Sequence, residues 1–293
     1  MRIPASVLSR VAAGLSLGLC LASASLAQTA LETLADTVER VENRLGARIG
    51  VSLVDTGSGL SWTHRENERF LMNSTMKVPL CGAVLARRDA GDLSLQTELP
   101  VRKSDLLAYA PVTEKRAGGE MTIAELCLAA IDMSDNTAAN LLIAHLGGPQ
   151  AVTRFFRSAG DTISRLDRNE PELNTFNAAD LRDTTTPAAM TETLRGLLLG
   201  DVLSRSSRGQ LAEWMSHGGV TGNLLRAEAP EGWVILDKSG SGTHTRNLVA
   251  LVTPVDGSPW IVTIFVSDVD ADSQTRNRAL QDVGRAAMAV MRG

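Results

Sequence analysis

The segment that decides the fold lies near the end of the chain, where residues 233–267 read WVILDKSGSGTHTRNLVALVTPVDGSPWIVTIFVS. Three β-rich runs, at 233–238, 247–254 and 259–267, are separated by stretches that contain Gly or Pro. This pattern predicts three consecutive strands. The apolar periodicity from about 273 to 291 predicts a helix after them.

The beginning of the chain contributes to the same sheet. Apolar residues recur at helical spacing over residues 30–45, and residues 49–55 form a strand-like run that ends at Thr56-Gly57-Ser58-Gly59. We therefore expect a helix followed by a hairpin, in a sheet that is built from both ends of the chain.

The middle of the chain has mainly helical periodicity. Helices are expected at 79–89, at 121–131 and at 136–146, and Gly147-Gly148-Pro149 marks the end of the last one. The predicted fold is α/β of the α+β type, an antiparallel sheet flanked by helices with an inserted all-helical part.

The same patterns predict how the chain is divided. Residues 28–64 and 217–293 are expected to form the α/β part, and residues 65–216 the helical part, which includes a loop at about 165–183. A cleft between two such parts is a common place for a ligand site.

The first 27 residues have the pattern of a secretory signal peptide. Arg2 and Arg10 give a positive start, residues 11–21 form an almost unbroken apolar run, and Ser25-Leu26-Ala27 offers the small residues of a cleavage site. A membrane anchor would need about 20 apolar residues, which this run does not reach. We therefore expect a periplasmic protein with no membrane contact after cleavage.

The composition excludes several classes of protein. Loss of the signal peptide removes two arginines and no acid, which leaves 27 basic and 33 acidic residues and a formal charge of −6. Four lysines and scattered arginines do not make the clustered basic surface that nucleic acid requires. No Gly-rich phosphate loop follows a predicted strand, so we expect no nucleotide cofactor.

The cysteines favour one disulfide. Cys20 belongs to the signal peptide, which leaves Cys81 and Cys127. An even pair in an exported protein indicates a disulfide, which would contribute about 4 kcal/mol on a chain-entropy model. Two buried free thiols are the alternative.

The first chemical motif is Ser74-Thr75-Met76-Lys77. On a helix, a spacing of three places the hydroxyl and the ammonium on one face. A serine hydroxyl becomes a nucleophile when a neighbour accepts its proton, and a lysine whose pKa is lowered by burial can do so. The alternative is an ordinary exposed helical turn.

Two further triplets lie far along the chain. Ser134-Asp135-Asn136 stands between two helical patterns, where its alternative role is a helix N-cap. Lys238-Ser239-Gly240 ends a predicted strand and offers a cation, a hydroxyl and a closely approaching backbone for a substrate carboxylate. Each triplet is common alone, but their order and spacing together are not.

In this order the three motifs resemble the signature of class A β-lactamases and penicillin-binding proteins. Residues 165–174, RLDRNEPELN, are similar to the Ω-loop of class A enzymes, which carries a hydrolytic glutamate. The similarity extends over nearly all of the chain after the signal peptide. It includes residues 109–112, 183–187 and 221–226 and the cysteine pair, and several of these stretches resemble the carbenicillin-hydrolysing branch.

The resemblance implies a serine β-lactamase that confers antibiotic resistance by hydrolysing β-lactams, chiefly penicillins. It implies that Ser74 is the nucleophile, that Lys77 is its neighbour in proton transfer, and that Ser134 passes the proton to the ring nitrogen. Glu170 would activate the water that hydrolyses the acyl-enzyme. Either Lys77 or Glu170 would accept the serine proton during acylation.

The resemblance also implies the substrate contacts. The backbone N–H groups of Ser74 and Ser241 would form the oxyanion hole. Asn136 would hold the acylamino side chain of the substrate, and Asn174 would act with Glu170. The other residues assigned to substrate binding are Tyr109, Lys238, Ser239, Gly240 and Arg246.

Some residues depart from the commoner pattern of the family. Ser239 replaces a threonine but keeps the hydroxyl, and Asn73 stands where many relatives have a cysteine. The turn after Gly242 is one residue shorter than in some relatives, so the alternative for Arg246 is a surface arginine of a hairpin. Arg168 and Asp183 match a pair that pins the Ω-loop, with an unimportant surface ion pair as the alternative.

Rival functions lack the features they need. A D,D-peptidase or a non-hydrolysing β-lactam sensor shares the acylation residues, but Glu170 argues against both. The four histidines, His64, His145, His217 and His244, have no metal-ligand spacing. We therefore expect no metal and no cofactor, small-molecule β-lactams as the partners, and a monomer.

Overall fold

A five-stranded antiparallel sheet forms the centre of the computed structural model, which describes residues 28–293. Its order is β2-β1-β9-β8-β7. The strands are β1 Arg48–Asp55, β2 Ser61–His64, β7 Val234–Ser241, β8 Arg246–Thr253 and β9 Trp260–Ser267. The sheet joins both ends of the described chain, which confirms the predicted fold class. The predicted signal peptide and Cys20 lie outside the described residues.

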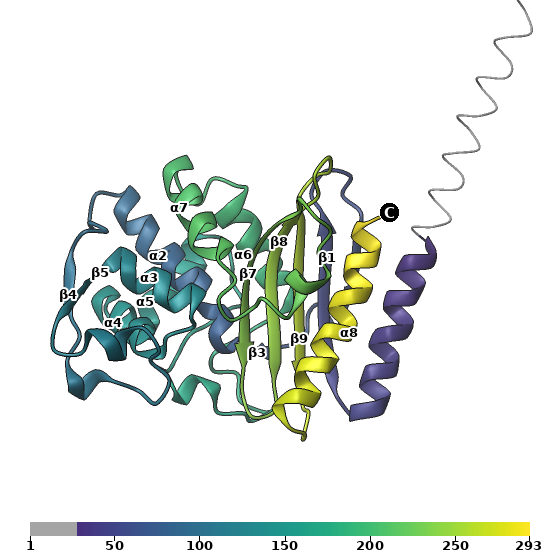
Figure 1. The fold of residues 1–293 in the computed structure, drawn as a ribbon, viewed down its shortest axis with the longest axis horizontal. Helices are drawn as coiled ribbons and strands as arrows, with labels where there is room; N and C mark the ends of the chain where they lie inside the picture. Colours follow the sequence, from purple (N-terminus) through teal and green to yellow (C-terminus); the bar gives the residue numbers. More distant parts are fainter. Residues whose placement is uncertain (1–27) are drawn as a thin grey trace, which may run out of the picture.

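Helices cover both faces of this sheet (Figure 1). On one face, the helix over residues 28–45 lies beside α8 Ser273–Met291, and both pack on alternate strand residues such as Val262 and Ile264. The other alternate residues, among them Ile261 and Phe265, belong to the core of the helical side. The period-2 pattern of β9 therefore divides its side chains between two cores, which explains why the whole strand is buried.

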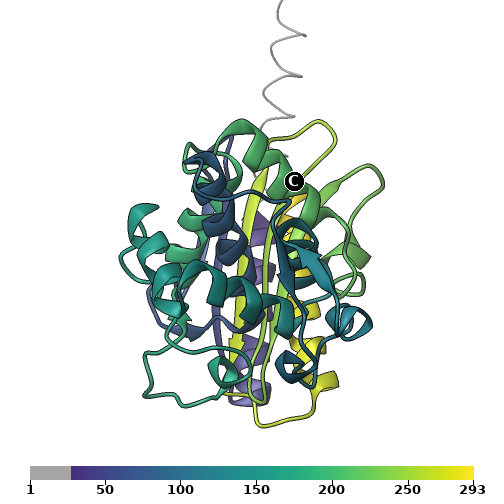
Figure 2. The same ribbon diagram turned by 90° about the vertical axis from the view of Figure 1, so that its left-hand side faces the viewer.

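The helical side of the molecule is built around α2, and Figure 2 shows this side facing the viewer. Its helices are α2 Lys77–Asp89, α3 Ile123–Asp132, α4 Asn136–Leu146, α5 Pro149–Ser158, α6 Pro187–Leu198 and α7 Arg205–Ser216. Nine consecutive residues at the start of α2 are buried, because the other helices surround it. Lys77 therefore enters the interior with the apolar residues of its helix.

Short elements complete the fold. The paired strands β3 Phe70–Leu71 and β6 Thr184–Thr185 form one ladder, and β4 Glu98–Pro100 and β5 Glu120–Thr122 form another. The short 3-10 helices are η1 Asn73–Met76, η2 Lys103–Asp105, η3 Thr113–Arg116, η4 Glu172–Asn174 and η5 Leu225–Glu228. None of the helices within residues 28–293 is long and apolar enough to cross a membrane.

Several bounds differ from the expectations. The helix expected at residue 121 begins at Ile123, because Met121 pairs with Leu99 in a ladder and Thr122 is the N-cap. The helix expected at 136–146 ends as predicted, with Gly147 as its C-cap, and Pro149 begins the next helix, α5, since proline is well suited to the first turn of a helix. The predicted boundaries between the two parts of the chain, at 64/65 and 216/217, stay a prediction.

The strand expected at 233–238 is longer than expected. It continues as β7 to Ser241, because Ser239, Gly240 and Ser241 pair with three residues at the start of β8. The third motif therefore lies within a strand and does not follow its end.

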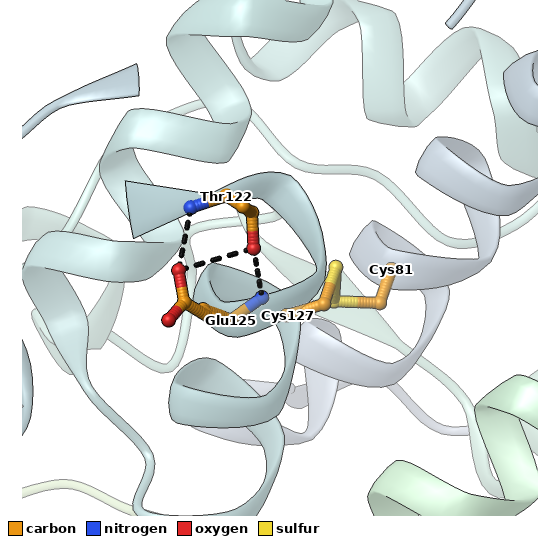
Figure 3. Close-up of a disulfide and its surroundings, with 4 residues drawn as sticks. All are labelled: Cys81, Thr122, Glu125 and Cys127. Carbon is orange, nitrogen blue, oxygen red and sulfur yellow. Dashed lines mark hydrogen bonds between the residues drawn. A yellow bond between two sulfur atoms is a disulfide. The ribbon is translucent and has the colours of Figure 1, made fainter. Parts of the chain in front are cut away.

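The predicted disulfide is present. Cys81 of α2 and Cys127 of α3 are bonded, with their Cα atoms 5.8 Å apart (Figure 3). Beside them, a capping box starts α3, in which the Thr122 backbone N–H donates to Glu125 Oε2 at 2.7 Å and the Glu125 N–H donates to Thr122 Oγ1 at 3.2 Å. The bond therefore ties the helix that follows Ser74 to the helix that leads to Ser134.

Replacing both cysteines, as Cys81→Ala with Cys127→Ala, is expected to lower the free energy of unfolding by about 4 kcal/mol, because the unfolded chain regains a 46-residue loop. The melting temperature should fall by about 10 °C in circular dichroism. The parent protein in reducing agent is the control and should melt like the variant. An unchanged melting temperature would contradict the stabilising role.

Candidate active site

A cavity of about 270 Å³ lies between the helical side and the edge of the sheet formed by β7. It is lined by Ser74, Tyr109, Ser134, Asn136, Asn174, Val220, Ser239, Ser241 and Arg246. Eight of these nine residues are among those that the sequence predicts for a substrate site. Val220 is the exception, because an isolated valine in a loop carries no sequence signal.

Ser74 and Lys77 lie at the junction of η1 and α2, where the spacing of three brings them together. Lys77 Nζ donates to Ser74 Oγ at 3.0 Å. Ser74 opens onto the cavity, whereas Lys77 is fully buried behind it. The pair is therefore no ordinary exposed helical turn, and the hydroxyl has a nitrogen within reach of its proton.

The second motif contributes oxygen atoms to the same ammonium group. Lys77 Nζ lies 2.9 Å from the Ser134 carbonyl oxygen, 3.4 Å from Ser134 Oγ and 2.6 Å from Asn136 Oδ1. Burial lowers the pKa of Lys77, and the nearby Glu170 carboxylate opposes this shift. Lys77 thus connects the two hydroxyls of Ser74 and Ser134.

Asp135 has the structural role that was the alternative for its motif. Its side chain accepts from the Ala138 N–H as the N-cap of α4 and from the Val112 and Thr113 N–H groups at 3.0 and 2.9 Å. The carboxylate is fully buried. This contact holds Ser134 and Asn136, on either side of it, towards Lys77.

Glu170 also contacts the Lys77 ammonium group. Its Oε1 is 3.1 Å from Lys77 Nζ at an ion-pair distance, and both side chains are fully buried. Its Oε2 accepts from Asn174 Nδ2 at 2.6 Å. Oε1 has no hydrogen-bond partner in the described part of the chain, so the contact with Lys77 is an ion pair without hydrogen-bond geometry.

Asn140 is a site residue that the sequence analysis missed. Its Oδ1 accepts from the Glu170 backbone N–H at 2.9 Å, and its Nδ2 donates to the Glu170 carbonyl oxygen at 2.8 Å. The available signal was its spacing, since it lies one helical turn after Asn136 on the same face of α4. This amide holds the backbone of Glu170 in place from a rigid helix.

The third motif lies on β7 against η1. A Cβ atom at Gly240 would be 2.9 Å from the Met72 carbonyl oxygen and 3.1 Å from the Ser74 nitrogen, so only glycine fits there. Lys238 is fully buried, and its Nζ donates to the Ser239 carbonyl oxygen at 2.9 Å. Burial is the main reason that the pKa of Lys238 lies well below its usual value, and repulsion from Lys77 adds to it.

Arg246 stands opposite Ser241 in the β7–β8 ladder and lines the cavity. Its Nε donates to Asn277 Oδ1 at 2.7 Å, and Nη1 donates to the Gly240 carbonyl oxygen at 3.2 Å. Burial and the nearby Arg276 lower the pKa of Arg246 to about 10, which leaves it cationic at neutral pH. Arg246 is thus not a hairpin surface arginine, and Asn277 is a second residue that the sequence analysis missed.

Comparisons with known proteins identify the family of the chain. The model of the β-lactamase enzyme family matches residues 33–291. A β-lactamase of Rhodobacter capsulatus is 68% identical over 292 residues, and the match covers 100% of both chains.

Two solved structures are similar in fold and sequence. A β-lactamase from Xanthomonas campestris has a TM-score of 0.86 and 44% identity, covering 89% of this chain and 98% of that one. An ancestral class A β-lactamase has a TM-score of 0.84 and 48% identity, covering 87% and 98%.

The chain belongs to the class A β-lactamases. It is a serine hydrolase of that class, and the sequence resemblance to the family is confirmed. The family match thus favours a β-lactamase over the D,D-peptidase and the β-lactam sensor that the sequence left as alternatives.

The Ω-loop of this class A enzyme is closed at its neck by Arg168 and Asp183. Arg168 Nε donates to Asp183 Oδ2 at 2.5 Å, and the side chains are only 15% and 1% exposed. Asp183 Oδ1 also accepts the backbone N–H groups of Asp167 and Arg168 at 2.7 and 3.0 Å. The pair is therefore a buried clamp of the loop that carries Glu170 and not a surface ion pair.

Tyr109, the last of the predicted substrate-binding residues, lies at the exposed edge of the site. It lies at the cavity and is 46% exposed, and its carbonyl oxygen accepts from the Asn136 N–H at 3.1 Å.

Within residues 28–293, no three or more His, Cys, Asp or Glu side chains are grouped in a way that could hold a metal ion.

The two buried lysines of the β-lactamase should respond in opposite ways to the same substitution. Lys238→Met is expected to raise the melting temperature by about 2–4 °C at pH 7, because it removes a cation whose burial outweighs the attraction of the Asp237 and Glu170 carboxylates. Lys77→Met should lower it, because the Glu170 carboxylate then stays buried without its cation. Thermal unfolding of both variants and the parent measures the effect.

The pH dependence checks the cause. The folded pKa of Lys238 is depressed, so its destabilising effect is full below that pKa and disappears as the pH approaches 10.5, the value for an unburied lysine. The gain from Lys238→Met should therefore shrink between pH 6 and pH 10. A gain that grows with pH, or a loss at pH 7, would show that burial of this charge does not destabilise the fold.

Proposed function

We propose that the enzyme hydrolyses β-lactams, chiefly penicillins, through an acyl-enzyme on Ser74 that is deacylated by a water activated by Glu170. One observation carries the proposal: Lys77 Nζ contacts both Ser74 Oγ, at 3.0 Å, and Glu170 Oε1, at 3.1 Å. The nucleophile and the carboxylate are thereby linked through a single buried group.

In the acylation step, Ser74 Oγ bonds to the carbonyl carbon of the lactam and its proton passes to Lys77. The lowered pKa of Lys77 favours this transfer, because a lysine that loses its proton more easily is available as a base. The ring C–N bond then breaks, and the nitrogen receives the proton from Lys77 through Ser134. Ser134 Oγ, 3.4 Å from Lys77 Nζ and exposed to the cavity, supports this relay.

The substrate is held by groups that match its charges. We assign Ser239 and Arg246 to binding of the substrate carboxylate, because cations and hydroxyls stabilise a carboxylate. Lys238 is buried and does not line the cavity, and its positive charge would attract the carboxylate electrostatically. Asn136 and Asn174 line the same cavity and are assigned to the acylamino side chain. The backbone N–H groups of Ser74 and Ser241 would stabilise the oxyanion, and Gly240 allows β7 to lie close to Ser74.

In the deacylation step, Glu170 removes a proton from water as the oxygen of that water bonds to the ester carbonyl carbon. The ester bond to Ser74 Oγ then breaks, and the proton that Glu170 took from the water passes to Ser74 Oγ through Lys77, which contacts both groups. The buried Oε1 atom of Glu170 makes no hydrogen bond to the described residues and keeps its acceptor capacity for that water. Asn174 and Asn140 hold the side chain and the backbone of Glu170.

The wider setting follows from the same proposal. Residues 109–112 and 221–226 resemble the carbenicillin-hydrolysing branch, which supports a preference for penicillins. A variant of the ancestral class A β-lactamase, 47% identical, has been solved with 5(6)-nitrobenzotriazole, which supports a small molecule as the ligand. We further propose that the mature chain is a periplasmic monomer that confers resistance to these antibiotics.

The test is the hydrolysis of benzylpenicillin by the purified mature enzyme, followed by ultraviolet absorbance with and without a metal chelator. Turnover should be rapid and equal in both conditions, because the proposed reaction uses only side chains. Loss of activity with the chelator would contradict the proposal. Stoichiometric acylation without turnover would assign the chain to the peptidase or sensor reaction instead.

Glu170→Gln should separate the two halves of the reaction. Acylation of Ser74 should continue, whereas deacylation should slow by about 10²–10⁴-fold because the general base is lost. Intact-protein mass spectrometry should then detect a penicilloyl adduct that persists in the variant and is transient in the parent. Ser74→Ala is the control and should form no adduct. A folded Glu170→Gln variant that forms no adduct would assign Glu170 to acylation.

A further inference from the structure

We propose that Asn73 is a positioning residue for deacylation, whose buried amide orients Asn174 and, through Asn174, the carboxylate of Glu170. The inference rests on the proposed function, because it assigns an additional residue to the deacylation step. Asn73 precedes the nucleophile in the chain, and the sequence analysis noted it only as a departure from the cysteine of relatives.

The side chain of Asn73 joins three parts of the fold. Its Nδ2 donates to Asn174 Oδ1 on the Ω-loop at 2.9 Å. Its Oδ1 accepts from Thr245 Oγ1 at 2.8 Å and from Asn247 Nδ2 of β8 at 3.0 Å. Asn73, Thr245 and Asn247 are at most 1% exposed, so water does not compete for the two hydrogen bonds that Asn73 Oδ1 accepts.

The direction of these hydrogen bonds is set by the groups at the two ends of the network. At one end, Asn247 Nδ2 faces the Leu71 carbonyl oxygen at 2.7 Å, and a carbonyl can only accept. At the other end, Glu170 Oε2 accepts from Asn174 Nδ2 at 2.6 Å. Between them, each amide must present its oxygen to the side of Asn247 and its nitrogen to the side of Glu170.

This polarity determines the function of the Asn73 amide group. Because two donors occupy Asn73 Oδ1, its Nδ2 is the atom that meets Asn174. Asn174 must then use its oxygen for Asn73, which leaves its nitrogen for Glu170. The N–H group of Asn73 therefore keeps the N–H group of Asn174, and not its oxygen, against the Glu170 carboxylate.

The backbone also favours asparagine at this position. Asn73 has φ of +48°, in the left-handed region, which asparagine and glycine adopt more easily than other residues. Glycine can therefore replace Asn73 without backbone strain while it removes the amide. This property separates a role of the side chain from a role of the backbone.

Asn73→Asp is the sharpest test. It keeps an oxygen for Thr245 and Asn247 but replaces the donor to Asn174 with a second oxygen. Asn174 should then turn its nitrogen to the introduced carboxylate and its oxygen to Glu170, so that the Glu170 carboxylate loses its hydrogen bond. We expect deacylation of benzylpenicilloyl-enzyme to slow by about 10–100-fold, because small displacements of a catalytic group have effects of that size.

The measurement separates acylation from deacylation. Quenched-flow mass spectrometry gives both rate constants, and the acylation rate should stay within about threefold of the parent while the adduct accumulates. In steady state, kcat and KM should fall together and kcat/KM should be retained, which a general loss of structure would not produce. Asn43→Asp, the same change on an exposed helix position, is the matched control and should behave like the parent.

Asn73→Gly provides the second variant and serves alone if Asn73→Asp does not fold. It should also slow deacylation selectively, because the amide is missing while the backbone is unstrained. The inference is overturned if the variants that fold deacylate within twofold of the parent, or if kcat/KM falls as much as kcat. A parent enzyme that does not turn over benzylpenicillin would refute the proposed function itself, which is a separate result.

Discussion

The active site depends on the burial of one ammonium group, that of Lys77. A lysine at the buried start of a helix must have polar partners around it, because an unpaired charge in the interior is strongly destabilising. Its partners come from three separated segments: Ser74 on its own turn, Ser134 and Asn136 at the start of α4, and Glu170 on the Ω-loop. The need to compensate this charge therefore brings Ser74, Ser134, Asn136 and Glu170 together around Lys77 Nζ.

Each of these partners is in turn held by a structural contact behind it. Asp135 caps α4 and fixes the second motif, Asn140 fixes the backbone of Glu170, and the pair of Arg168 with Asp183 closes the Ω-loop. Helices α2 and α4 thus carry Lys77, Asn136 and Asn140, while Ser134 and Glu170 lie in loops. This arrangement allows a loop to place a carboxylate accurately, because its ends and its middle are tied to regular elements.

The same site shows why a functional centre destabilises the fold that carries it. Lys238 and Arg246 lie close together at one end of the cavity, and burial lowers the pKa of both. Such an arrangement suits a ligand with a negative charge, because the negative charge of the ligand would compensate the two buried positive charges. The fold is stabilised against the cost of burying these charges by the disulfide between α2 and α3 and by the two cores on either side of the sheet.

Much of this protein was determined by the sequence itself. Hydrophobic periodicity predicted α4 and α8 with their observed bounds and placed four strands of the sheet, β1, β7, β8 and β9, within a few residues. A spacing of three was enough to predict that Ser74 and Lys77 meet, because that contact lies within one turn. The cysteine pair was also predictable, since an even number of cysteines in an exported chain favours pairing.

Only the tertiary structure decided which distant groups face these residues. The contacts of Asn140 with Glu170, of Asn277 with Arg246 and of Asn73 with Asn174 join segments 30 or more residues apart. The extension of β7 through Gly240 likewise depends on its pairing with β8 and on its approach to η1. Local propensity contains no information on such contacts, because the direction of a buried hydrogen bond is set by whichever donors and acceptors the folded chain brings together.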